Sequence, residues 1–339
     1  MSGPQRFGSD KPTVSAIVPM LNEAEHIGAC LAGFVAQTYP ELIEIMVIDG
    51  GSTDGSLEIV EEWALRDPRI RLLNNSRRIA AAAANIGLHQ SIGEVLCYLS
   101  AHGVPDSRYV EVAVEVLVRT GAAGVGGRYL HEGFDPVGNA IGAAMASPFG
   151  MASPHRSATS ECVVDTISHP VFVKQALLDA GGYDESLLRN EDYETNQRVR
   201  AIGGSLVFTP EISSVYRPRR TLRLLGRQFF DYGRWKSEVM VRRPADVRPR
   251  HLAAPAAVAL GFTVSVSLVP VSTRRIGTGI LLALAGLYSA GLVAALVHEG
   301  GERRRGMSIR HFLMAMPVMH IAWGSGVWAG LRDALRRRR

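Results

Sequence analysis

The feature that most restricts how this sequence folds is a set of long hydrophobic stretches in its C-terminal third. Residues Ile276–Val297 contain no Asp, Glu, Lys or Arg, and Leu252–Val271 and Phe312–Leu331 are also uncharged. A helix crosses the hydrocarbon core of a bilayer with about 20 apolar residues. The alternative, a bundle of buried helices, would show polar residues at helical spacing, which Ile276–Val297 lacks. We therefore expect transmembrane or membrane-associated helices over residues 251–332.

Basic residues around these stretches indicate membrane lipids as a partner and leave the topology open. The formal net charge is +5, and arginines flank the apolar segments, which suits anionic head groups. They do not alternate with aromatic residues, so we expect no binding to nucleic acid. A tight turn at Ser272–Arg275 would place Arg274 and Arg275 on the far side, against the positive-inside rule. Re-entrant or interfacial packing of one stretch removes part of this conflict.

The N-terminal residues show no export signal. Met1–Lys11 are polar and lack the apolar core of a secretory signal. Cys30, Cys97 and Cys162 lack metal-ligand spacing, which favours a reducing compartment. We therefore expect a disordered tail over residues 1–12 and a multi-pass protein of the cell membrane with a cytoplasmic N-terminal domain. Residues 333–339 form a basic tail.

Short apolar strands alternate with amphipathic helices from Val14 to about Tyr216. This alternation predicts an α/β domain over residues 13–219 with a parallel sheet, in which ligands bind at the carboxyl ends of the strands. Residues Gly126–Glu161 are rich in Gly, Ala, Ser, Pro and Met, and we expect irregular structure there. Thr221–Val241 mixes aromatic and basic residues, which predicts an amphipathic helix at the membrane interface within residues 220–250.

Two polar motifs follow the first two predicted strands. Pro19–Glu23 reads PMLNE and Asp49–Gly55 reads DGGSTDG. An Asp at a strand end can accept hydrogen bonds from a uracil or a ribose, and neighbouring glycines let the backbone approach a ligand closely. Either motif alone is a common turn. Together, at successive strand ends, they predict a nucleotide site.

These motifs resemble those of family 2 glycosyltransferases of the GT-A fold, in which P-x-x-N-E is followed by D-D/G-x-S-x-D-G-[ST]. The resemblance covers roughly Val14–Lys236 and implies a Rossmann-like nucleotide-diphospho-sugar transferase domain. Four further matches occur in the family's order: Asn85–Gly87, Gly93–Glu94, Gly181–Asp184 and Asn190–Glu194. The resemblance implies a nucleotide pocket lined by Pro19, Glu23, Asp49 and Asp54.

Arg78 has two interpretations. Its guanidinium matches the geometry of phosphate, and a solvated surface Arg is the alternative. Arg77 and Arg78 are adjacent, so only one of them can point inward.

The pair Glu191–Asp192 is similar to the E-D motif of the family, whose Asp deprotonates the acceptor hydroxyl. An inverting transfer needs one carboxylate within reach of that hydroxyl. The structural alternative is an acid in the first turn of a helix from Asp192 to Ile202, and the two roles are compatible.

The metal motif of the family is altered in this chain. The fourth strand usually ends in D-x-D, which holds Mg²⁺ or Mn²⁺, and here it ends in Ser100-Ala101-His102. Glycosyltransferases of the succinoglycan exopolysaccharide type often have D-A-H there, so His102 matches and Ser100 replaces the Asp. Imidazole binds Mn²⁺, and a serine hydroxyl is a weak ligand. We expect a divalent cation near His102, bound weakly or helped by phosphates, water or Asp106, with Ser100 and Ala101 beside the donor.

The segment Arg227–Lys236 resembles the Q-x-x-x-Y-G-R-W stretch of the same subgroup. The resemblance implies contacts of Gln228, Arg234 and Trp235 with the diphosphate and the acceptor sugar. The alternative is an aromatic and basic anchor at the membrane interface. His169, which precedes Pro170, is interpreted as structural because no residue at the right spacing makes it a ligand or a base.

The expected function is an inverting transfer of a sugar from a nucleoside diphosphate sugar, a UDP-sugar, to a lipid-linked or polysaccharide acceptor. It would take place at the cytoplasmic membrane face, in exopolysaccharide or cell-surface glycan synthesis. The alternative is a catalytically degenerate GT-A domain that acts as a membrane scaffold in a polysaccharide assembly complex. A nucleotidyltransferase ranks last, because the chain lacks a Gly- and Lys-rich phosphate loop near the first strand.

Overall fold

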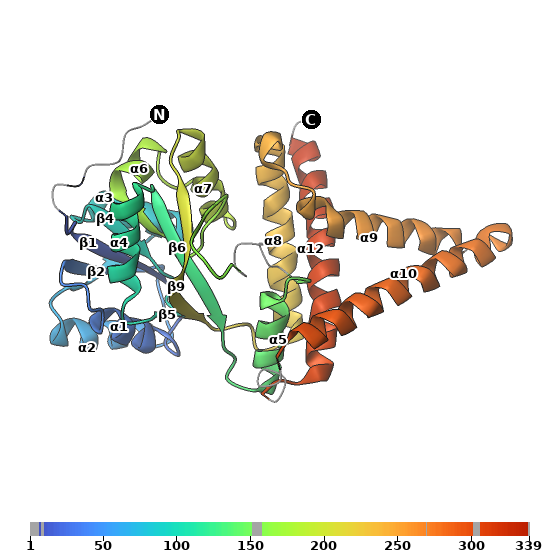
Figure 1. The fold of residues 1–339 in the computed structure, drawn as a ribbon, viewed down its shortest axis with the longest axis horizontal. Coiled ribbons are helices and arrows are strands. Elements are labelled where there is room, and N and C mark those ends of the chain that lie inside the picture. Colours follow the sequence, from blue (N-terminus) through green and yellow to red (C-terminus); the bar gives the residue numbers. More distant parts are fainter. Residues whose placement is uncertain (1–6, 8–9, 151–157, 269, 301–305, 338–339) are drawn as a thin grey trace. The chain divides into compact units, whose positions relative to one another are not determined.

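The computed structural model describes residues 7, 10–150, 158–268, 270–300 and 306–337 (Figure 1). The chain divides into two compact units. The first comprises Met1–Leu130 and Pro154–Tyr216, and the second comprises His131–Ser153 and Arg217–Arg339. Most of the predicted N-terminal tail, Arg303–Arg305 and the last two residues of the basic tail lie outside the described residues.

A single mixed sheet forms the first unit within the described residues, with the strand order β3-β2-β1-β4-β8-β6-β9-β5 and with β7 paired to β9. The strands are β1 (Val14–Met20), β2 (Leu42–Asp49), β3 (Ile70–Asn74), β4 (Val95–Tyr98), β5 (Gly103–Pro105), β6 (Gly124–His131), β7 (Cys162–Val164), β8 (Val171–Val173) and β9 (Leu206–Tyr216). Strands β1 to β4 run parallel to one another, whereas β8 is antiparallel to β4 and β6. The predicted parallel sheet is therefore the first part of a mixed one.

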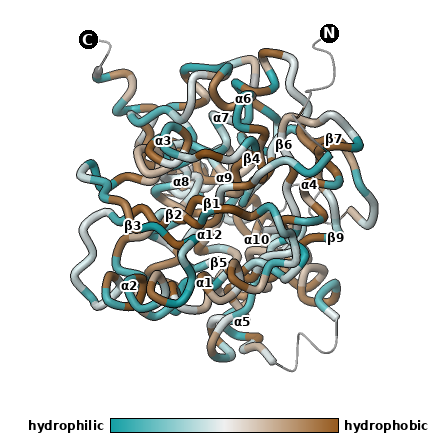
Figure 2. Tube along the Cα trace, turned by 90° about the vertical axis from the view of Figure 1, so that its left-hand side faces the viewer, coloured by the Kyte–Doolittle hydropathy of each residue, from teal (hydrophilic) through white to brown (hydrophobic). Residues whose placement is uncertain are grey.

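The register of the parallel strands brings three chain segments to one edge. Met20 lies opposite Asp49, and Asp49 lies opposite Asn74. Strands β1 and β2 are buried along nearly their whole length and appear as hydrophobic segments in Figure 2. Burial on both faces fixes which residues leave the sheet at its carboxyl edge.

Six helices of the first unit connect these strands: α1 (Ile27–Val35), α2 (Ser56–Arg66), α3 (Ala80–Gln90), α4 (Tyr109–Thr120), α6 (Lys174–Asp179) and α7 (Glu191–Ala201). Helix α3 approaches β1 closely because its packing face consists of small residues. Ala81–Ala84 are buried, and a Cβ atom on Gly87 would lie 2.6 Å from Cδ1 of Ile17. Gly87, part of the Asn85–Gly87 motif, is thus required by helix–sheet packing.

The expectation of irregular structure over Gly126–Glu161 is wrong for its first part. Strand β6 continues to His131, and helix α5 (Pro136–Ala146) follows in the second unit. Asp135 caps this helix by accepting a hydrogen bond from the Gly138 amide, and Pro136 occupies its first turn. The helix is rich in Ala and Gly, so its hydrophobic contrast is too weak to show a helical period. Residues 151–157 lie outside the described residues.

The second unit is helical in its described part. It contains α5, α8 (Leu222–Arg242), the 3₁₀ turn η2 (Pro244–Asp246), α9 (Arg250–Ser267), α10 (Val271–His298) and α12 (Ile309–Arg337). Within the described residues, two helical segments are long and apolar enough to cross a membrane, judged by length and composition alone. They are Arg274–His298 and Ile309–Arg336, and 6% and 39%, respectively, of an apolar 18-residue window within each segment is buried. The predicted stretch Leu252–Val271 corresponds mainly to the shorter helix α9.

A buried carboxylate holds the amino-terminal edge of the parallel strands together. Glu44 on β2 is 3% exposed and accepts hydrogen bonds from Ser15 Oγ at 2.6 Å and from the Ile92 amide at 2.7 Å. Arg71 on β3 forms an ion pair with it at 2.6 Å. One side chain therefore serves three neighbouring segments.

We predict that Glu44→Ala lowers the free energy of unfolding by about 3 kcal/mol, because it leaves buried donors without an acceptor. Thermal or denaturant unfolding of the detergent-solubilised protein measures this loss. Glu61→Ala, an exposed Glu on α2, is the matched control and should change stability by less than about 0.5 kcal/mol. Equal effects of the two substitutions would contradict the structural role of Glu44.

Candidate functional site

The segments that follow β1 and β2 are joined by hydrogen bonds between their polar side chains and backbone amides. The Thr53 amide donates to Asn22 Oδ1 at 2.9 Å, and the Asn22 amide donates to Ser52 Oγ at 2.8 Å. The Glu23 amide donates to Ser56 Oγ at 2.8 Å. The two motifs found in the sequence thus form one structure at the carboxyl edge of the sheet.

Asp49 and Asp54 accept hydrogen bonds within this structure. Asp49, which is 5% exposed, accepts from the Gly51 amide at 2.7 Å and from the amide and hydroxyl of Ser52. Asp54 is exposed and accepts from the Ala24 amide at 3.0 Å and from Ser56. The hydrogen bond from the Ser56 hydroxyl, and then that from the Ala24 amide, lower the pKa of Asp54. Both carboxylates therefore stabilise the loops, whatever else they bind.

Asn75 lies beside Asp49 and was missed by the sequence analysis. Its amide donates to the Asp49 carbonyl at 2.7 Å, and its Nδ2 donates to the Ile79 carbonyl at 3.0 Å. Its Oδ1 is buried and accepts no hydrogen bond from the part of the chain that the structure describes. A buried acceptor without a donor is unfavourable by about 1–3 kcal/mol, so it marks a position where a ligand N–H group can bind. The only sequence signal is the polar pair Asn74-Asn75 at the end of a strand.

The structure distinguishes Arg77 from Arg78, which are adjacent in the loop after β3. Arg77 forms an ion pair with Glu185. Arg78 is exposed and lies next to the nucleotide-motif loop, because a Cβ atom on Gly50 would be 3.5 Å from Cα of Arg78. The Arg78 side chain forms no ion pair with any described residue. Of these two arginines, Arg78 is therefore the one whose charge is not paired with a described carboxylate.

Ser100, which follows β4, belongs to a network of polar side chains. Ser100 Oγ is 3.2 Å from His169 Nε2, and His169 Nδ1 is 2.8 Å from Ser214 Oγ. The buried His169 also accepts a hydrogen bond from Tyr109 Oη through its carbonyl at 2.6 Å. Its ring therefore fixes Ser100, which occupies the position of the first D-x-D carboxylate. Buried Ala101 follows Ser100 without contributing a side-chain polar group.

His102 pairs with a residue of the first motif. Its Nδ1 lies 3.0 Å from Oε1 of Glu23, and its ring lies edge-on to Tyr216. No group of three or more His, Cys, Asp or Glu side chains in the described residues could hold a metal ion. The donor set therefore does not fit a cation held by protein carboxylates, and a cation at His102 stays a prediction.

The Glu191–Asp192 pair lies at the start of α7, near the end of β4. Asn190 precedes it in a left-handed conformation, and the Tyr193 amide donates to Asp192 Oδ1 at 2.7 Å. Burial, and then the Asp192 charge, raise the pKa of Glu191 to about 7. Burial and the nearby Glu191 charge also raise the pKa of Tyr98, the last residue of β4. The structure thus brings the predicted base to the same strand end as Ser100.

Four non-glycine residues of the described chain have positive φ: Asn22, Arg78, His169 and Asn190. Each belongs to, or directly precedes, one of the segments described above. Side chains with a Cβ atom rarely adopt this conformation, and such strained residues cluster at binding and catalytic sites. Their distribution supports a single site at the carboxyl edge, independently of any motif.

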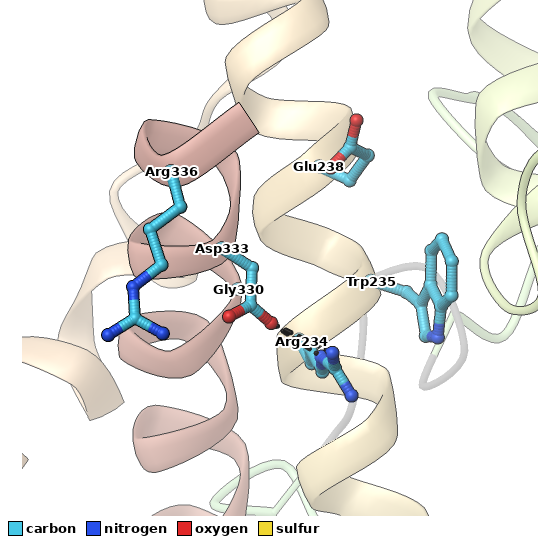
Figure 3. A pocket seen from close by; sticks show the side chains of 6 residues that line it. All are labelled: Arg234, Trp235, Glu238, Gly330, Asp333 and Arg336. Atoms are coloured by element: carbon cyan, nitrogen blue, oxygen red, sulfur yellow. Dashed lines mark hydrogen bonds and ion pairs between the residues drawn. The ribbon is translucent and has the colours of Figure 1, made fainter. Parts of the chain in front are cut away.

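The three residues predicted on α8 lie in the second unit. Gln228 is buried and its Nε2 donates to Tyr232 Oη at 2.8 Å. Arg234 forms an ion pair with Asp333 on α12 at 2.8 Å. Arg234 and Trp235 line an open cavity of about 310 Å³ together with Glu238, Gly330, Asp333 and Arg336 (Figure 3). The charge of Arg234 is therefore largely compensated within its own unit.

Comparisons with known proteins identify relatives of this chain. The family described as Glycosyl transferase family 2 matches residues 15–154. Over 333 residues, the sequence is 32% identical to the succinoglycan biosynthesis protein ExoA of Rhizobium meliloti, covering 95% of this chain and 96% of that protein.

Solved structures share the fold. The mannosyltransferase PcManGT from Pyrobaculum calidifontis, in complex with GDP-Man and Mn²⁺, is similar with a TM-score of 0.58 and 20% identity, covering 94% of this chain and 90% of that one. GalNAc-T7 with UDP, GalNAc and Mn²⁺ is similar with a TM-score of 0.51 and 18% identity, covering 70% of this chain and 51% of that one. The predicted GT-A domain followed by apolar C-terminal helices is thereby confirmed.

We predict that Glu191→Gln makes the stability of the protein less sensitive to a rise in pH from about 5 to 8. The folded state raises the pKa of Glu191 from 4.5 to about 7, so the protonated form stabilises the fold at low pH. That contribution is lost as the pH rises through about 7, when a second carboxylate forms beside Asp192. Between about pH 5 and pH 8 the wild type should lose on the order of 2 kcal/mol relative to Glu191→Gln. Thermal unfolding at several pH values measures the two stabilities. The same dependence of stability on pH in both proteins would contradict this assignment.

Proposed function

This chain belongs to glycosyltransferase family 2, whose members transfer a sugar from a nucleotide sugar, and from that premise we propose its donor, acceptor and catalytic residues. We propose that it transfers a sugar, with inversion, from UDP-sugar to a hydroxyl of a lipid-linked or polysaccharide acceptor. The reaction takes place at the cytoplasmic face of a membrane, in exopolysaccharide or cell-surface glycan synthesis. The observation that carries this proposal is the convergence of the Asp49 loop, Arg78, Ser100 and Glu191–Asp192 at one edge of the sheet.

The nucleotide site is the edge formed by the segments after β1, β2 and β3. Pro19, Glu23, Asp49 and Asp54 shape it, and the free Oδ1 of Asn75 accepts an N–H of the base. A uracil and a guanine both present a ring N–H, and the similar solved structures hold GDP-Man or UDP. Asp49 at the end of β2 is placed to accept hydrogen bonds from a uracil or a ribose, and we propose UDP as the nucleotide. GDP is included in the binding test as the alternative.

Asp192 acts as the general base. It accepts the proton of the acceptor hydroxyl while that oxygen forms a bond to the anomeric carbon and the bond to the diphosphate breaks. Burial raises the pKa of Glu191, which makes Glu191 the less suitable proton acceptor of the pair. The negative charge that develops on the diphosphate is stabilised by Arg78 and by backbone N–H groups of the loops. Ser100, held by His169, donates or accepts a hydrogen bond beside the diphosphate.

The proposal for the acceptor side rests on the resemblance of Arg227–Lys236 to the family motif and on the similarity to a succinoglycan biosynthesis protein. Gln228, Arg234 and Trp235 contact the acceptor sugar or diphosphate, and the acceptor is a lipid-linked or growing glycan. The similarity to a succinoglycan biosynthesis protein supports a role in exopolysaccharide synthesis. The pairing of Arg234 with Asp333 favours the alternative for this residue, which is anchoring at the membrane interface.

A scaffold without catalysis is the second candidate function. The loss of both D-x-D carboxylates, at Ser100 and His102, favours it. Against it, the Glu191–Asp192 pair has a raised pKa for Glu191 and lies beside the strand end that would hold the diphosphate. A scaffold needs neither feature.

We predict that the solubilised protein binds UDP more tightly than GDP and that Asp49→Ala weakens UDP binding by about tenfold or more, which is about 1.4 kcal/mol or more. Isothermal calorimetry with Mn²⁺, with Mg²⁺ and with EDTA measures the affinity and any cation effect. Asp49→Asn tests the carboxylate charge while keeping the side-chain shape, and Glu61→Ala is the exposed control. Absence of binding of either nucleotide under every condition would favour the scaffold.

We predict that Asp192→Asn lowers sugar transfer by about 10²–10⁴-fold, the usual contribution of a general base, and leaves UDP affinity unchanged. Radiolabelled transfer from UDP-sugars to lipid extracts measures the rate, and calorimetry measures the affinity. Asp179→Asn, an exposed Asp on α6, should keep the wild-type rate. Full activity of Asp192→Asn would exclude this residue as the base.

A further inference from the structure

The second unit contains a close pair of helices, α8 and α12, with very different polarity. The two helices touch through glycines: a Cβ atom on Gly233 would lie 2.1 Å from the Trp323 carbonyl, and one on Gly326 would lie 2.1 Å from the Phe230 carbonyl. Substitution at either glycine would therefore separate the helices. The ion pair of Arg234 with Asp333 joins them near their C-terminal ends.

The order of these contacts shows that α8 and α12 run parallel. Gly226 lies near Val318, Gly233 near Trp323, and Gly330 near Ser237, so residue numbers increase together along both helices (Figure 1). The middle of α12 is therefore at the same level as the middle of α8. Whatever environment surrounds one helix also surrounds the other.

Helix α8 cannot lie in hydrocarbon. Between Gly226 and Ser237 it carries Arg227, Asp231 and Arg234, which are exposed or partly exposed. A charged side chain at the centre of a bilayer is energetically costly. Because α12 is held along this polar helix, the same cost applies to any arrangement in which α12 spans a membrane.

The exposed side of α12 has a composition typical of a helix that lies on a membrane surface. Met314, Ile321, Trp328 and Leu335 are all exposed and recur at intervals of seven residues, so they form one apolar stripe along the helix. Trp328 is the residue type that favours the membrane–water interface. Arg310 near the start of the helix, and Arg332 and Arg336 near its end, are exposed and suit anionic head groups.

Helices α9 and α10 form a hairpin that contacts α12 next to this apolar stripe. Trp328 Nε1 donates to the Pro255 carbonyl of α9 at 2.9 Å, and Tyr288 Oη of α10 is 2.8 Å from His320, next to Ile321. Beyond these contacts the hairpin is exposed and apolar, with exposed residues such as Phe262 and Leu282. From Tyr288 to Arg275, α10 extends about 20 Å at 1.5 Å per residue.

We propose that the second unit binds the membrane from one side: the α9–α10 hairpin enters the bilayer, and α12 lies along the surface with its stripe against the lipids. This inference rests on the membrane location given under the proposed function. The hairpin passes the middle of a hydrocarbon core about 30 Å thick, and Arg274 and Arg275 at its turn extend toward the head groups of the far leaflet. The arrangement differs from three spanning helices, because both ends of α12 remain on one side.

Cysteine labelling tests the proposal with the full chain. In a Cys162→Ser background, in which Cys30 and Cys97 are fully buried, single Arg310→Cys and Arg336→Cys substitutions mark the two ends of α12. An impermeant maleimide is applied to right-side-out and to inverted membrane vesicles. We expect both positions to be labelled in the same orientation of the vesicles, and Asp179→Cys reports the side of the first unit. Labelling of the two ends in opposite orientations would overturn the inference.

A position in the hairpin supplies the second measurement. Leu282→Cys should resist the impermeant maleimide in both kinds of vesicle and react after solubilisation in detergent. Reaction in intact vesicles would show that the hairpin lies outside the bilayer and would also overturn the inference. Recovery of the unmodified protein in the soluble fraction would instead refute the proposed membrane location. Sugar transfer, measured separately, tests the catalytic part of the proposal.

Discussion

The parallel pairing of β1, β2 and β3 is the constraint on which the candidate site depends. It places Met20, Asp49 and Asn74 at one level, so that the three segments that follow must meet at one edge. The pairing of Ser15 with Glu44 supports this register, because a shift by one residue would turn Glu44 to the other face, away from Ser15. Everything proposed for nucleotide binding follows from this alignment.

At that edge, the residues proposed to bind the donor also have structural roles. Asp49 holds its own loop, Asp54 joins that loop to the one after β1, His169 holds Ser100, and Glu23 pairs with His102. Such a network keeps polar groups oriented before a ligand arrives, which lowers the cost of ordering them on binding. It also explains how a family 2 member can keep an organised strand end after a Ser has replaced a metal-binding carboxylate.

In the second unit, small residues determine how closely the helices α8 and α12 approach each other. Gly233, Gly326 and Gly330 allow α8 and α12 to approach until backbone atoms touch. Small residues at a helix interface permit this approach in water and in lipid alike. The consequence for function is that an apolar sequence in α12 is tied to a polar partner, and hydropathy alone does not reveal that partner.

The sequence by itself determined the alternation of strands and helices, the two loop motifs, the Glu191–Asp192 pair and the apolar C-terminal stretches, because these signals are local. Only the tertiary structure decided that Asn75 has a buried acceptor without a donor, that His169 orients Ser100, and that Arg78 rather than Arg77 lies at the nucleotide loops. It also revealed helix α5, which has too little hydrophobic contrast to show a period. For Ser100 and for the two arginines, the deciding contact is made by residues far away in the sequence, so no local pattern carries it.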